Sequence, residues 1–242
     1  GVDTDVSPYD SGSYASSTAY LTGMAAVKAS KSMIRLITEK GAEYLEKTPE
    51  EVEFDGERVM AKDGSAAISL KDIGNRAMAN NGKALEVTDS HSSPVSPPPF
   101  MVGIAEIEMD KETCDFELVN YVAVVDCGTP INPALVRVQT EGGLGQGIGM
   151  AMFEDVTRSE KGQVYENSFM QYKLPSRVDV GNIRVEFESS YEPTGPFGVK
   201  SIGEVVINTP SPAIAGAVAN ATGVQIRELP VTPEKIFREL HK

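Results

Sequence analysis

The spacing of apolar side chains predicts a long helix after a polar opening stretch. Residues 1–17 are rich in Ser, Asp and Gly, which is typical of a loop. Apolar residues then recur at helical spacing, namely Leu21, Met24, Ala25, Ile34 and Ile37. We expect a helix from near Ser17 or Thr18 to about Glu46, unless Gly41 ends it earlier.

Short alternating runs predict a small antiparallel sheet between residues 51 and 70. The Asp-Gly dipeptides at 55–56 and 63–64 are typical of hairpin turns, so we expect two or three strands here.

A short helix and one more strand are expected to follow this sheet. Ser69 and Asp72 form an approximate capping box, which predicts a helix to about Ala79. The Asn81-Gly82 turn signal then predicts a strand at about residues 84–88.

A proline-rich connector divides the chain. Residues 90–99 contain four prolines within six positions, which excludes regular structure. We therefore expect a first α+β subdomain at residues 1–96, with the long helix and the small sheet, and a second at residues 97–242.

Alternation of period two predicts the main strands of the second subdomain. Residues 100–110 and 116–126 alternate and are separated by a turn, and residues 183–190 alternate again. In the second run the residues expected to share a face are Val119, Tyr121, Ala123 and Val125. Between residues 157 and 191 we expect further short strands and turns.

A glycine-rich helix is expected at about residues 133–153. Five glycines lie within eight positions from Gly142 to Gly149, and each would weaken a free helix by up to roughly 1 kcal/mol against alanine. Tertiary contact must compensate, and the glycines allow close approach of another backbone or a flat ligand. The spacing does not form the dinucleotide-binding pattern after a strand, so we exclude a Rossmann fold.

Glu204 is the first candidate for chemistry. It lies between Gly203 and the apolar run at 205–207. The glycine lets the backbone approach another group, and the apolar neighbours raise the free-energy cost of ionising the carboxyl. These features suit a general base. The alternative is an exposed acid in a loop before a strand.

Two helices are expected in the last forty residues. Asn208 or Ser211 can cap the first, Pro212 suits its first position, and small residues run from 213 to 221. Thr232 and Pro233 open the last helix. The residues expected to form its buried stripe are Ile236, Phe237 and Leu240.

Composition and charge exclude several classes of protein. The chain has 242 residues, 40% hydrophobic content and a net charge of −13, so nucleic-acid binding is not expected. No run reaches the roughly 20 apolar residues of a membrane span, and no export leader is evident. The two cysteines form no CxxC pair and the two histidines lie far apart. We expect free thiols in the cytoplasm and no histidine-based metal site.

Several segments together resemble one enzyme family. KSIGE at 200–204, followed by a proline-containing turn and a helix of small residues, is similar to the C-terminal part of the molybdenum hydroxylases, the xanthine dehydrogenase and aldehyde oxidase family. The same family shows D-x-G-x-x-x-N-P, here at 126–133, and Q-x-E-G-G-x-x-Q-G-x-G, here at 139–149. The segments FMQYKLP at 169–175 and TPEK at 232–235 also match. The resemblance covers nearly the whole chain.

The resemblance implies a fold, an activity and a set of site residues. The implied fold is α+β, the C-terminal molybdopterin-binding region with mixed antiparallel strands and packed helices. The implied activity is oxidation of an N-heterocycle or aldehyde with oxygen from water. In the family the Glu at the position of Glu204 is the catalytic base beside the metal. The implied cofactor contacts are Ala15, Ser16, Ser17, Thr18, Gln139 and Gly203. Without the family, residues 16–18 would be helix caps and Gln139 an ordinary helix residue.

The implied cofactor is molybdopterin with molybdenum, in the plain or the cytosine dinucleotide form. The metal is held by the pterin, which would explain why the chain shows no His or Cys ligand set. Iron–sulfur clusters and FAD are expected on partner chains or missing domains. The rest of the molybdenum subunit is expected on another segment or chain. The chain is therefore expected to be a fragment or a split subunit that is inactive alone.

Two alternatives belong to other functional classes. The chain could be a noncatalytic structural or assembly subunit that keeps the fold without bound cofactor. It could also be an unrelated acidic α+β binding module whose glycine-rich helix packs on a partner. Proximity in space of Ser16, Gln139 and Glu204 is expected only of the molybdenum hydroxylase fold.

Overall fold

The computed structural model describes residues 3–10 and 12–242, and its contacts divide the chain into two compact units. The first unit contains residues 21–94 with the described part of residues 1–12. The second contains residues 13–20 and 95–242. The N-terminal segment at 13–20 thus belongs to the same unit as the C-terminal half of the chain. The division into subdomains at 96/97 stays a prediction.

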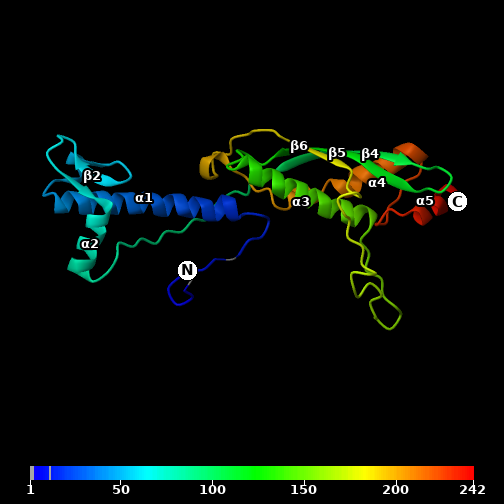
Figure 1. The fold of residues 1–242 in the computed structure, drawn as a ribbon, viewed down its shortest axis with the longest axis horizontal. Helices are drawn as coiled ribbons and strands as arrows, with labels where there is room; N and C mark the ends of the chain where they lie inside the picture. The colour runs from blue at the N-terminus through cyan, green and yellow to red at the C-terminus, as the bar shows by residue number, and fades with distance from the viewer. Residues whose placement is uncertain (1–2, 11) are drawn as a thin grey trace. The chain divides into compact units, whose positions relative to one another are not determined.

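The first unit combines a long helix with a small antiparallel sheet (Figure 1). In chain order the elements are α1 (Thr18–Tyr44, whose first turn lies in the second unit), η1 (Pro49–Glu51), β1 (Val52–Phe54), β2 (Arg58–Ala61), β3 (Ala67–Ser69) and α2 (Leu70–Asn81). The sheet has the order β1-β2-β3 with both pairs antiparallel. The three strands and two helices agree with the predicted pattern.

Three local details of the first unit depend on side-chain contacts. Helix α1 continues through Gly41, because a Cβ at this position would lie 2.6 Å from Val59 and glycine lets the sheet approach. Ser69 Oγ accepts a hydrogen bond from the Asp72 amide at 3.1 Å and caps α2. The predicted strand at 84–88 is wrong: these residues form no regular structure, and Leu85 packs against the core instead.

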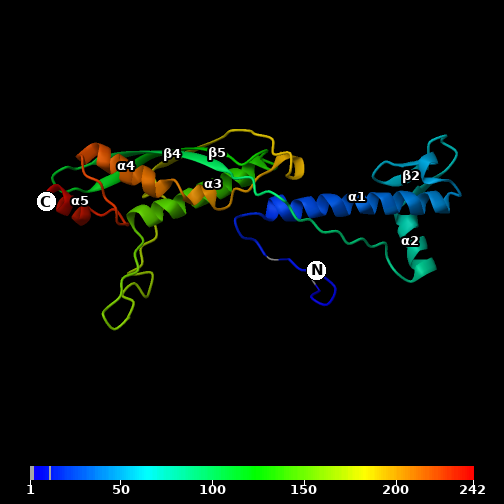
Figure 2. The same cartoon turned by 180° about the vertical axis from the view of Figure 1, so that it is seen from behind.

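The second unit is a three-stranded sheet with helices on one face (Figures 1 and 2). Its elements are β4 (Phe100–Met109), β5 (Phe116–Asp126), α3 (Pro133–Met152), β6 (Asn182–Phe187), η2 (Pro196–Gly198), η3 (Val205–Ile207), α4 (Pro210–Thr222) and α5 (Pro233–Leu240). The strand order is β4-β5-β6, antiparallel between β4 and β5 and parallel between β5 and β6. The α+β class with antiparallel strands and packed helices is confirmed.

The alternation of β5 is interrupted by one extra residue. Glu106 pairs with Asn120 and Ile107 pairs with Leu118, so Val119 has no partner on β4. This irregularity reverses the faces along the strand. Leu118 is buried like Tyr121, and Val119 is only half-buried, whereas the sequence predicted that Val119 shares a face with Tyr121.

The last two helices differ in detail from their predicted form. Helix α4 begins at Pro210 with Thr209 before it, and not at Pro212. Asn208 caps nothing there because it already ends the short helix η3. In α5 only Ile236 is buried, while Phe237 and Leu240 stay 49% and 40% exposed.

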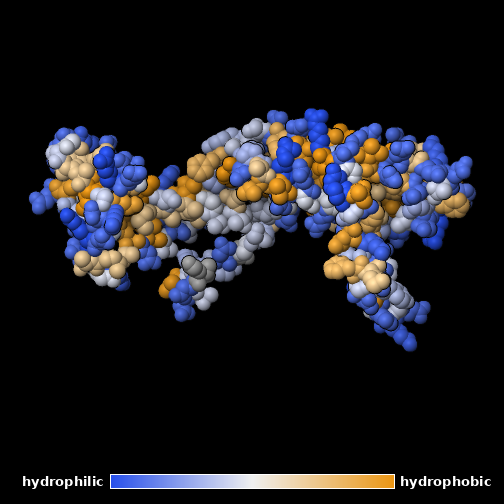
Figure 3. Space-filling model, viewed as in Figure 1, coloured by the Kyte–Doolittle hydropathy of each residue, from blue (hydrophilic) through white to orange (hydrophobic). Residues whose placement is uncertain are grey.

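Residues 154–181 form an arm with little regular structure, drawn in yellow-green in Figure 1. The strands expected here are reduced to an isolated bridge between Arg158 and Val164. Phe169 and Met170 of this segment are 83% and 81% exposed. Hydrophobic residues also reach the surface elsewhere on the face shown in Figure 3. None of the helices within 3–10 and 12–242 combines the length and apolarity needed to cross a bilayer.

The glycines of α3 allow the segment around Val206 to pack directly on the helix. A Cβ on Gly143 would lie 2.2 Å from Val206 Cγ2, and one on Gly147 would lie 2.6 Å from Pro210 Cγ. Gly142 and Gly145 face open space. The tertiary contact that the sequence required is therefore present along one stripe of the helix, at 143 and 147.

We expect Gly143→Ala to destabilise the second unit. The new methyl group overlaps Val206, and overpacking of this kind costs about 1–3 kcal/mol. Gly142→Ala on the same helix meets no atom within 4 Å, so it should stabilise by up to about 1 kcal/mol through helix propensity. Urea unfolding of both variants measures the difference. Equal effects of the two substitutions would contradict the close contact.

Candidate functional site

The loop before α1 has an unusual backbone. Ala15 and Ser16 both adopt left-handed conformations, with φ of 47° and 54°. Such conformations cost about 1–3 kcal/mol each for residues other than glycine, and they persist where the surroundings impose them. A hydrogen bond from the Ser17 amide to the Tyr14 carbonyl closes the turn at 3.1 Å. The loop thus holds the Ser16 side chain in one direction.

A buried tyrosine attaches this loop to the second unit. Tyr20 is 4% exposed, and its hydroxyl lies 2.6 Å from Thr194 Oγ1. Its ring also lies close to Gly195, where a Cβ would be 3.0 Å from Tyr20 Cδ2. The segment at 13–20 is therefore anchored at its end by the chain just before Glu204.

The predicted site residues meet at Gly203 and Glu204. Ser16 Oγ donates to Glu204 Oε2 at 3.0 Å, and Gln139 Nε2 donates to the Gly203 carbonyl at 3.3 Å. A Cβ on Gly203 would lie 2.7 Å from Ser16 Oγ. Three segments up to 188 residues apart thus come together, and the prediction that they converge is confirmed. Their chemical roles stay predictions.

These residues border a groove of about 300 Å³ within the second unit. Its polar lining includes Ser13, Ser16, Thr129, Asn132, Gln139 and Lys200, and Gly203 contributes backbone. Its apolar lining includes Ile131 and Leu135, which are 57% and 65% exposed. The groove therefore offers hydroxyl, amide and ammonium donors beside an apolar wall.

Some predicted site residues lie outside this lining. Ala15, Ser17 and Thr18 do not line the groove, and Thr18 is the first residue of α1. The sequence predicted apolar neighbours around the Glu204 carboxylate. Glu204 is exposed instead, so the apolar run at 205–207 does not enclose it. That run turns inward instead, with Val206 fully buried against α3.

Several groove residues were missed by the sequence analysis. Thr129 and Asn132 belong to the D-x-G-x-x-x-N-P pattern at 126–133, which was noted without assigning them a role. Lys200 opens the KSIGE motif. The pattern itself was thus the available signal for all three. Ser13 carries no comparable signal.

A nearly buried ion pair supports the segment that carries Glu204. Lys200 Nζ lies 2.8 Å from Asp126 Oδ2, and the side chains are 10% and 19% exposed. Asp126 Oδ1 accepts hydrogen bonds from Ser190 Oγ at 2.6 Å and from the Gly128 amide at 2.9 Å. Burial alone raises the pKa of Asp126, but the hydrogen bonds outweigh burial and hold this pKa below its ordinary value.

The backbone around this ion pair is tightly fitted. The Lys200 amide donates to the Cys127 carbonyl at 2.8 Å, and the Thr129 amide donates to the Gly198 carbonyl at 2.8 Å. A Cβ on Gly128 would lie 2.3 Å from that same carbonyl oxygen. Glycine at 128, with φ of 73°, is therefore required both by conformation and by space.

Cys127 lines the groove, but its surroundings disfavour the reactive thiolate. The residue is 2% exposed, and burial, together with the negative charge of Asp126, raises the pKa of the thiol. A thiol in this state is a poor nucleophile. Within the described residues, no group of three or more His, Cys, Asp or Glu side chains could hold a metal ion.

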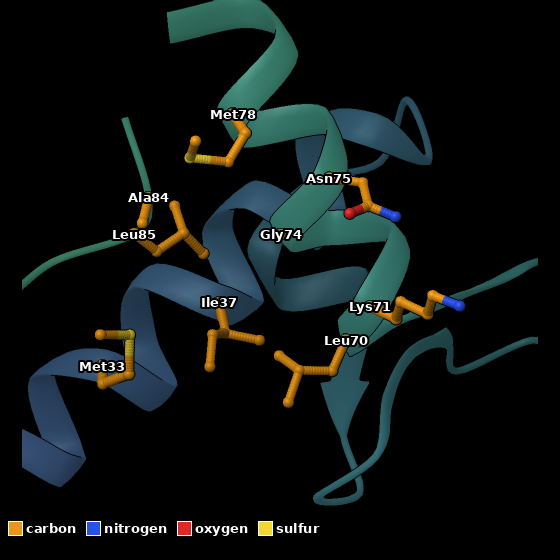
Figure 4. Close-up of a pocket in the computed structure, with 9 residues that line it drawn as sticks. All are labelled: Met33, Ile37, Leu70, Lys71, Gly74, Asn75, Met78, Ala84 and Leu85. Carbon is orange, nitrogen blue, oxygen red and sulfur yellow. The ribbon is translucent and has the colours of Figure 1, made fainter. Parts of the chain in front are cut away.

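A cavity in the first unit has a different character from the groove (Figure 4). It measures about 400 Å³ and lies between α1, α2 and the segment at 84–85. Its lining is apolar apart from Lys71 and Asn75, and the Lys71 side chain points away from Ile37 and Leu85. Apart from Lys71, its lining has no acid, base or nucleophile. The groove of the second unit, which carries the predicted site residues, is therefore the better candidate for a functional site.

Comparison with known proteins assigns the family. The model of the molybdopterin cofactor-binding domain matches residues 1–181, and the chain belongs to this family. It is 32% identical to the xanthine dehydrogenase molybdenum-binding subunit of Escherichia coli, over 99% of this chain and 32% of that protein. It is 33% identical to the gamma subunit of the 6-hydroxypseudooxynicotine dehydrogenase complex of Paenarthrobacter nicotinovorans, over 97% of this chain and 31% of that protein.

A solved structure supports the fold. The crystal structure of a Cu,Mo-CO dehydrogenase matches 99% of this chain and 32% of its own chain, with a TM-score of 0.81 and 24% identity. The chain spans about a quarter to a third of the length of the curated relatives that it matches.

We expect Asp126→Asn to destabilise the second unit by about 3 kcal/mol, because it leaves the Lys200 ammonium buried without a counter-ion. The folded-state pKa of Asp126 lies below its unfolded value. The stabilisation is therefore present above the unfolded pKa and is lost as pH falls through the folded one. The difference in the free energy of unfolding between wild type and Asp126→Asn should therefore become smaller below about pH 4.

Denaturant unfolding between pH 7 and pH 3 measures this effect. Glu186→Gln is the control, because it removes an exposed ion pair with Arg184 and should cost less than about 1 kcal/mol. A constant difference between wild type and Asp126→Asn at all pH values would contradict the role of the Asp126 charge.

Proposed function

We propose that the chain is part of the molybdenum-binding subunit of a molybdopterin-dependent hydroxylase or dehydrogenase. The observation that carries this proposal is the hydrogen bond from Ser16 Oγ to Glu204 Oε2 at 3.0 Å. It joins two segments that each match a cofactor-contacting motif of the family. The family match and the relatives support the same class.

The residues at the groove fit a cofactor with a flat ring system and anionic groups. Gly203 lets the Ser16 side chain lie against the backbone beside Glu204, because a Cβ there would be 2.7 Å from Ser16 Oγ. Hydroxyl and amide donors precede or flank the start of α1, and a helix N-terminus favours anions. The exposed apolar side chains of Ile131 and Leu135 suit a ring face. In this proposal Ala15, Ser16, Ser17, Thr18, Gln139 and Gly203 contact molybdopterin.

Glu204 is the general base of the proposed reaction. When bound, the molybdenum cofactor supplies the metal centre at which the substrate is oxidised with oxygen from water. Oε2 of Glu204 is held by Ser16, while Oε1 accepts no hydrogen bond from the described residues. The Ser16 hydroxyl thus orients the carboxylate and leaves one oxygen to take a proton. The short helix η3, fixed against α3, keeps the backbone of Glu204 in place.

The proposed substrate is an N-heterocycle or an aldehyde. One relative carries xanthine in its name, and another is a subunit of a dehydrogenase complex. The chain spans only part of such proteins, so the remaining part of the subunit completes the substrate pocket. Iron–sulfur and flavin subunits or domains receive the electrons, and the assembly acts in the cytoplasm.

Metal and nucleotide analysis of the complex from its native host tests this function. We expect molybdenum and pterin in stoichiometric amount, and nucleotide analysis then separates the plain from the cytosine dinucleotide form. A native complex without molybdenum and pterin would overturn the proposal in favour of a noncatalytic subunit.

In the complete enzyme, Glu204→Gln should keep the fold and the bound cofactor but lose turnover. Gln has nearly the same volume and can still accept a hydrogen bond from Ser16, but it cannot take a proton. Loss of a general base typically lowers the rate 10²–10⁴-fold. The loss should appear in kcat and kcat/KM together, as expected for an interaction made in the transition state. Steady-state kinetics and molybdenum content measure the two effects.

Glu228→Gln is the control for this experiment, because Glu228 is a surface carboxylate with 83% exposure of its side chain. It should leave turnover unchanged. If Glu204→Gln keeps more than about a tenth of the activity, the barrier has changed by less than about 1.4 kcal/mol. Glu204 would then not be the base.

The 242-residue chain by itself should bind no molybdenum cofactor tightly and should be inactive. Glu204, Gln139 and Leu135 are all exposed, so the chain forms an open face around only part of the cofactor. Few contacts leave little binding energy to offset the cost of ordering a ligand. Metal analysis of the purified chain after loading with cofactor measures this. Stoichiometric retention would contradict the open-face interpretation.

A further inference from the structure

The outer face of the second sheet carries an apolar patch. Met101, Ala105 and Ile107 of β4 face the core, so the intervening side chains face outward. Three of these outward residues, Phe100, Val102 and Ile104, are apolar and 61–63% exposed. Val124 of β5 pairs with Val102 and is 41% exposed. We call Phe100, Val102, Ile104 and Val124 the β4 patch.

This patch departs from the usual pattern of a sheet with one solvated face. Such a face normally alternates apolar inward with polar outward residues. Strand β6 follows that rule, because Arg184 and Glu186 point outward and form an ion pair at 3.0 Å. On β4 the rule fails at three successive outward positions. Clustered exposed apolar residues on an otherwise polar face mark a surface that another polypeptide covers.

The polar surroundings of the patch indicate the chemistry of that polypeptide. Further along the same face, Glu108 on β4 pairs directly with Glu117 on β5. Like charges at opposite cross-strand positions are destabilising, and neither carboxylate forms an ion pair with a described residue. A partner with a basic group beside an apolar segment would match both halves of this face.

The other end of the patch reaches the ion pair below the groove. The Lys200 ammonium lies 5.4 Å from the centre of the Phe100 ring. A polypeptide that covers Phe100 would also exclude water from the side of the Lys200–Asp126 pair. Covering the patch would therefore strengthen the support of the segment that carries Glu204.

The length of the relatives indicates where the covering segment comes from. The chain spans 25–32% of their length, so most of a subunit of this type lies outside these 242 residues. A second copy of the chain fits less well, because each copy carries a net charge of −13 and the copies repel each other.

We propose that the β4 patch is covered by a segment of the same molybdenum subunit that lies outside this chain. This inference rests on the proposed function only in taking the chain as part of such a subunit. The segment is apolar where it meets Phe100, Val102 and Ile104, and it places at least one Lys or Arg beside Glu108 and Glu117.

Thiol labelling at Val102→Cys tests the proposal. The native cysteines are suitable for this experiment, because Cys114 and Cys127 are only 1% and 2% exposed. The control is Glu186→Cys, an exposed position on the polar part of the same face. The reactivity of both variants toward N-ethylmaleimide is measured in the 242-residue chain and in the complete subunit within its native complex.

We expect V102C to react as fast as E186C in the chain alone. In the complete subunit V102C should react at least tenfold more slowly than it does in the chain alone. A benzophenone maleimide attached to V102C in the 242-residue chain, before addition of the remaining polypeptide, should then crosslink to that polypeptide. Mass spectrometry of the crosslinked peptides should identify a segment outside the 242 residues and carrying Lys or Arg.

Three results would overturn the proposal. The first is equal reactivity of V102C in the chain and in the complete subunit. The second is a reactivity of V102C that falls in the chain alone as the protein concentration rises, together with a dimer in light scattering. The patch would then bind a second copy of the chain. The third is a crosslink to an iron–sulfur or flavin subunit. None of these measurements depends on molybdenum or on turnover. Failure of the proposed function and failure of the proposed interface can therefore be told apart.

Discussion

The close contact between α3 and the segment around Val206 is the constraint on which the site depends. Glycine at 143 and 147 lets Val206 and Pro210 pack directly on the helix. The same helix carries Gln139, whose amide holds the Gly203 carbonyl. Any side chain at 143 would push η3 outward and move Glu204 with it. The glycines lower the helix propensity of α3. In return they let the segment that carries Glu204 pack on the same helix that carries Gln139.

Much of the site could be predicted from the sequence because its residues lie in compact motifs. The family motifs indicate Ser16, Gln139, Gly203 and Glu204, and these residues lie together in the structure. The remaining features depend on contacts between distant segments. No local sequence pattern indicates that β5 pairs in parallel with β6, or that β5 contains Val119 as an extra residue. The start of α4 was misplaced because η3 uses Asn208 first. Lys200 was overlooked because its role appears only with Asp126 beside it.

Exposure and burial separate two kinds of polar group in the second unit. The Lys200–Asp126 pair is nearly buried, and the Asp126 carboxylate accepts hydrogen bonds from Lys200, Ser190 and the Gly128 amide, so the pair acts as a fixed support under the groove. Glu204 and Gln139 are exposed at its rim. Removing water from the rim would strengthen every electrostatic interaction there. This chain therefore supplies the fixed support of the site, the Lys200–Asp126 pair. The dielectric environment of Glu204 depends on the polypeptide or ligand that covers it.

The hydrogen bond between Ser16 and Glu204 has a consequence for the order of folding. The two residues are 188 positions apart, and residues 21–94 of the first unit lie between them in the sequence. Contacts between residues so far apart in the sequence form late, because the chain loses the entropy of the intervening loop before it gains the favourable free energy of the contact. The core of the second unit can assemble from residues 95–242, with the segment at 13–20 docking afterwards. Orientation of the Glu204 carboxylate by Ser16 would then be among the last steps of folding, and a protease that removed the first seventeen residues would abolish it without touching the core.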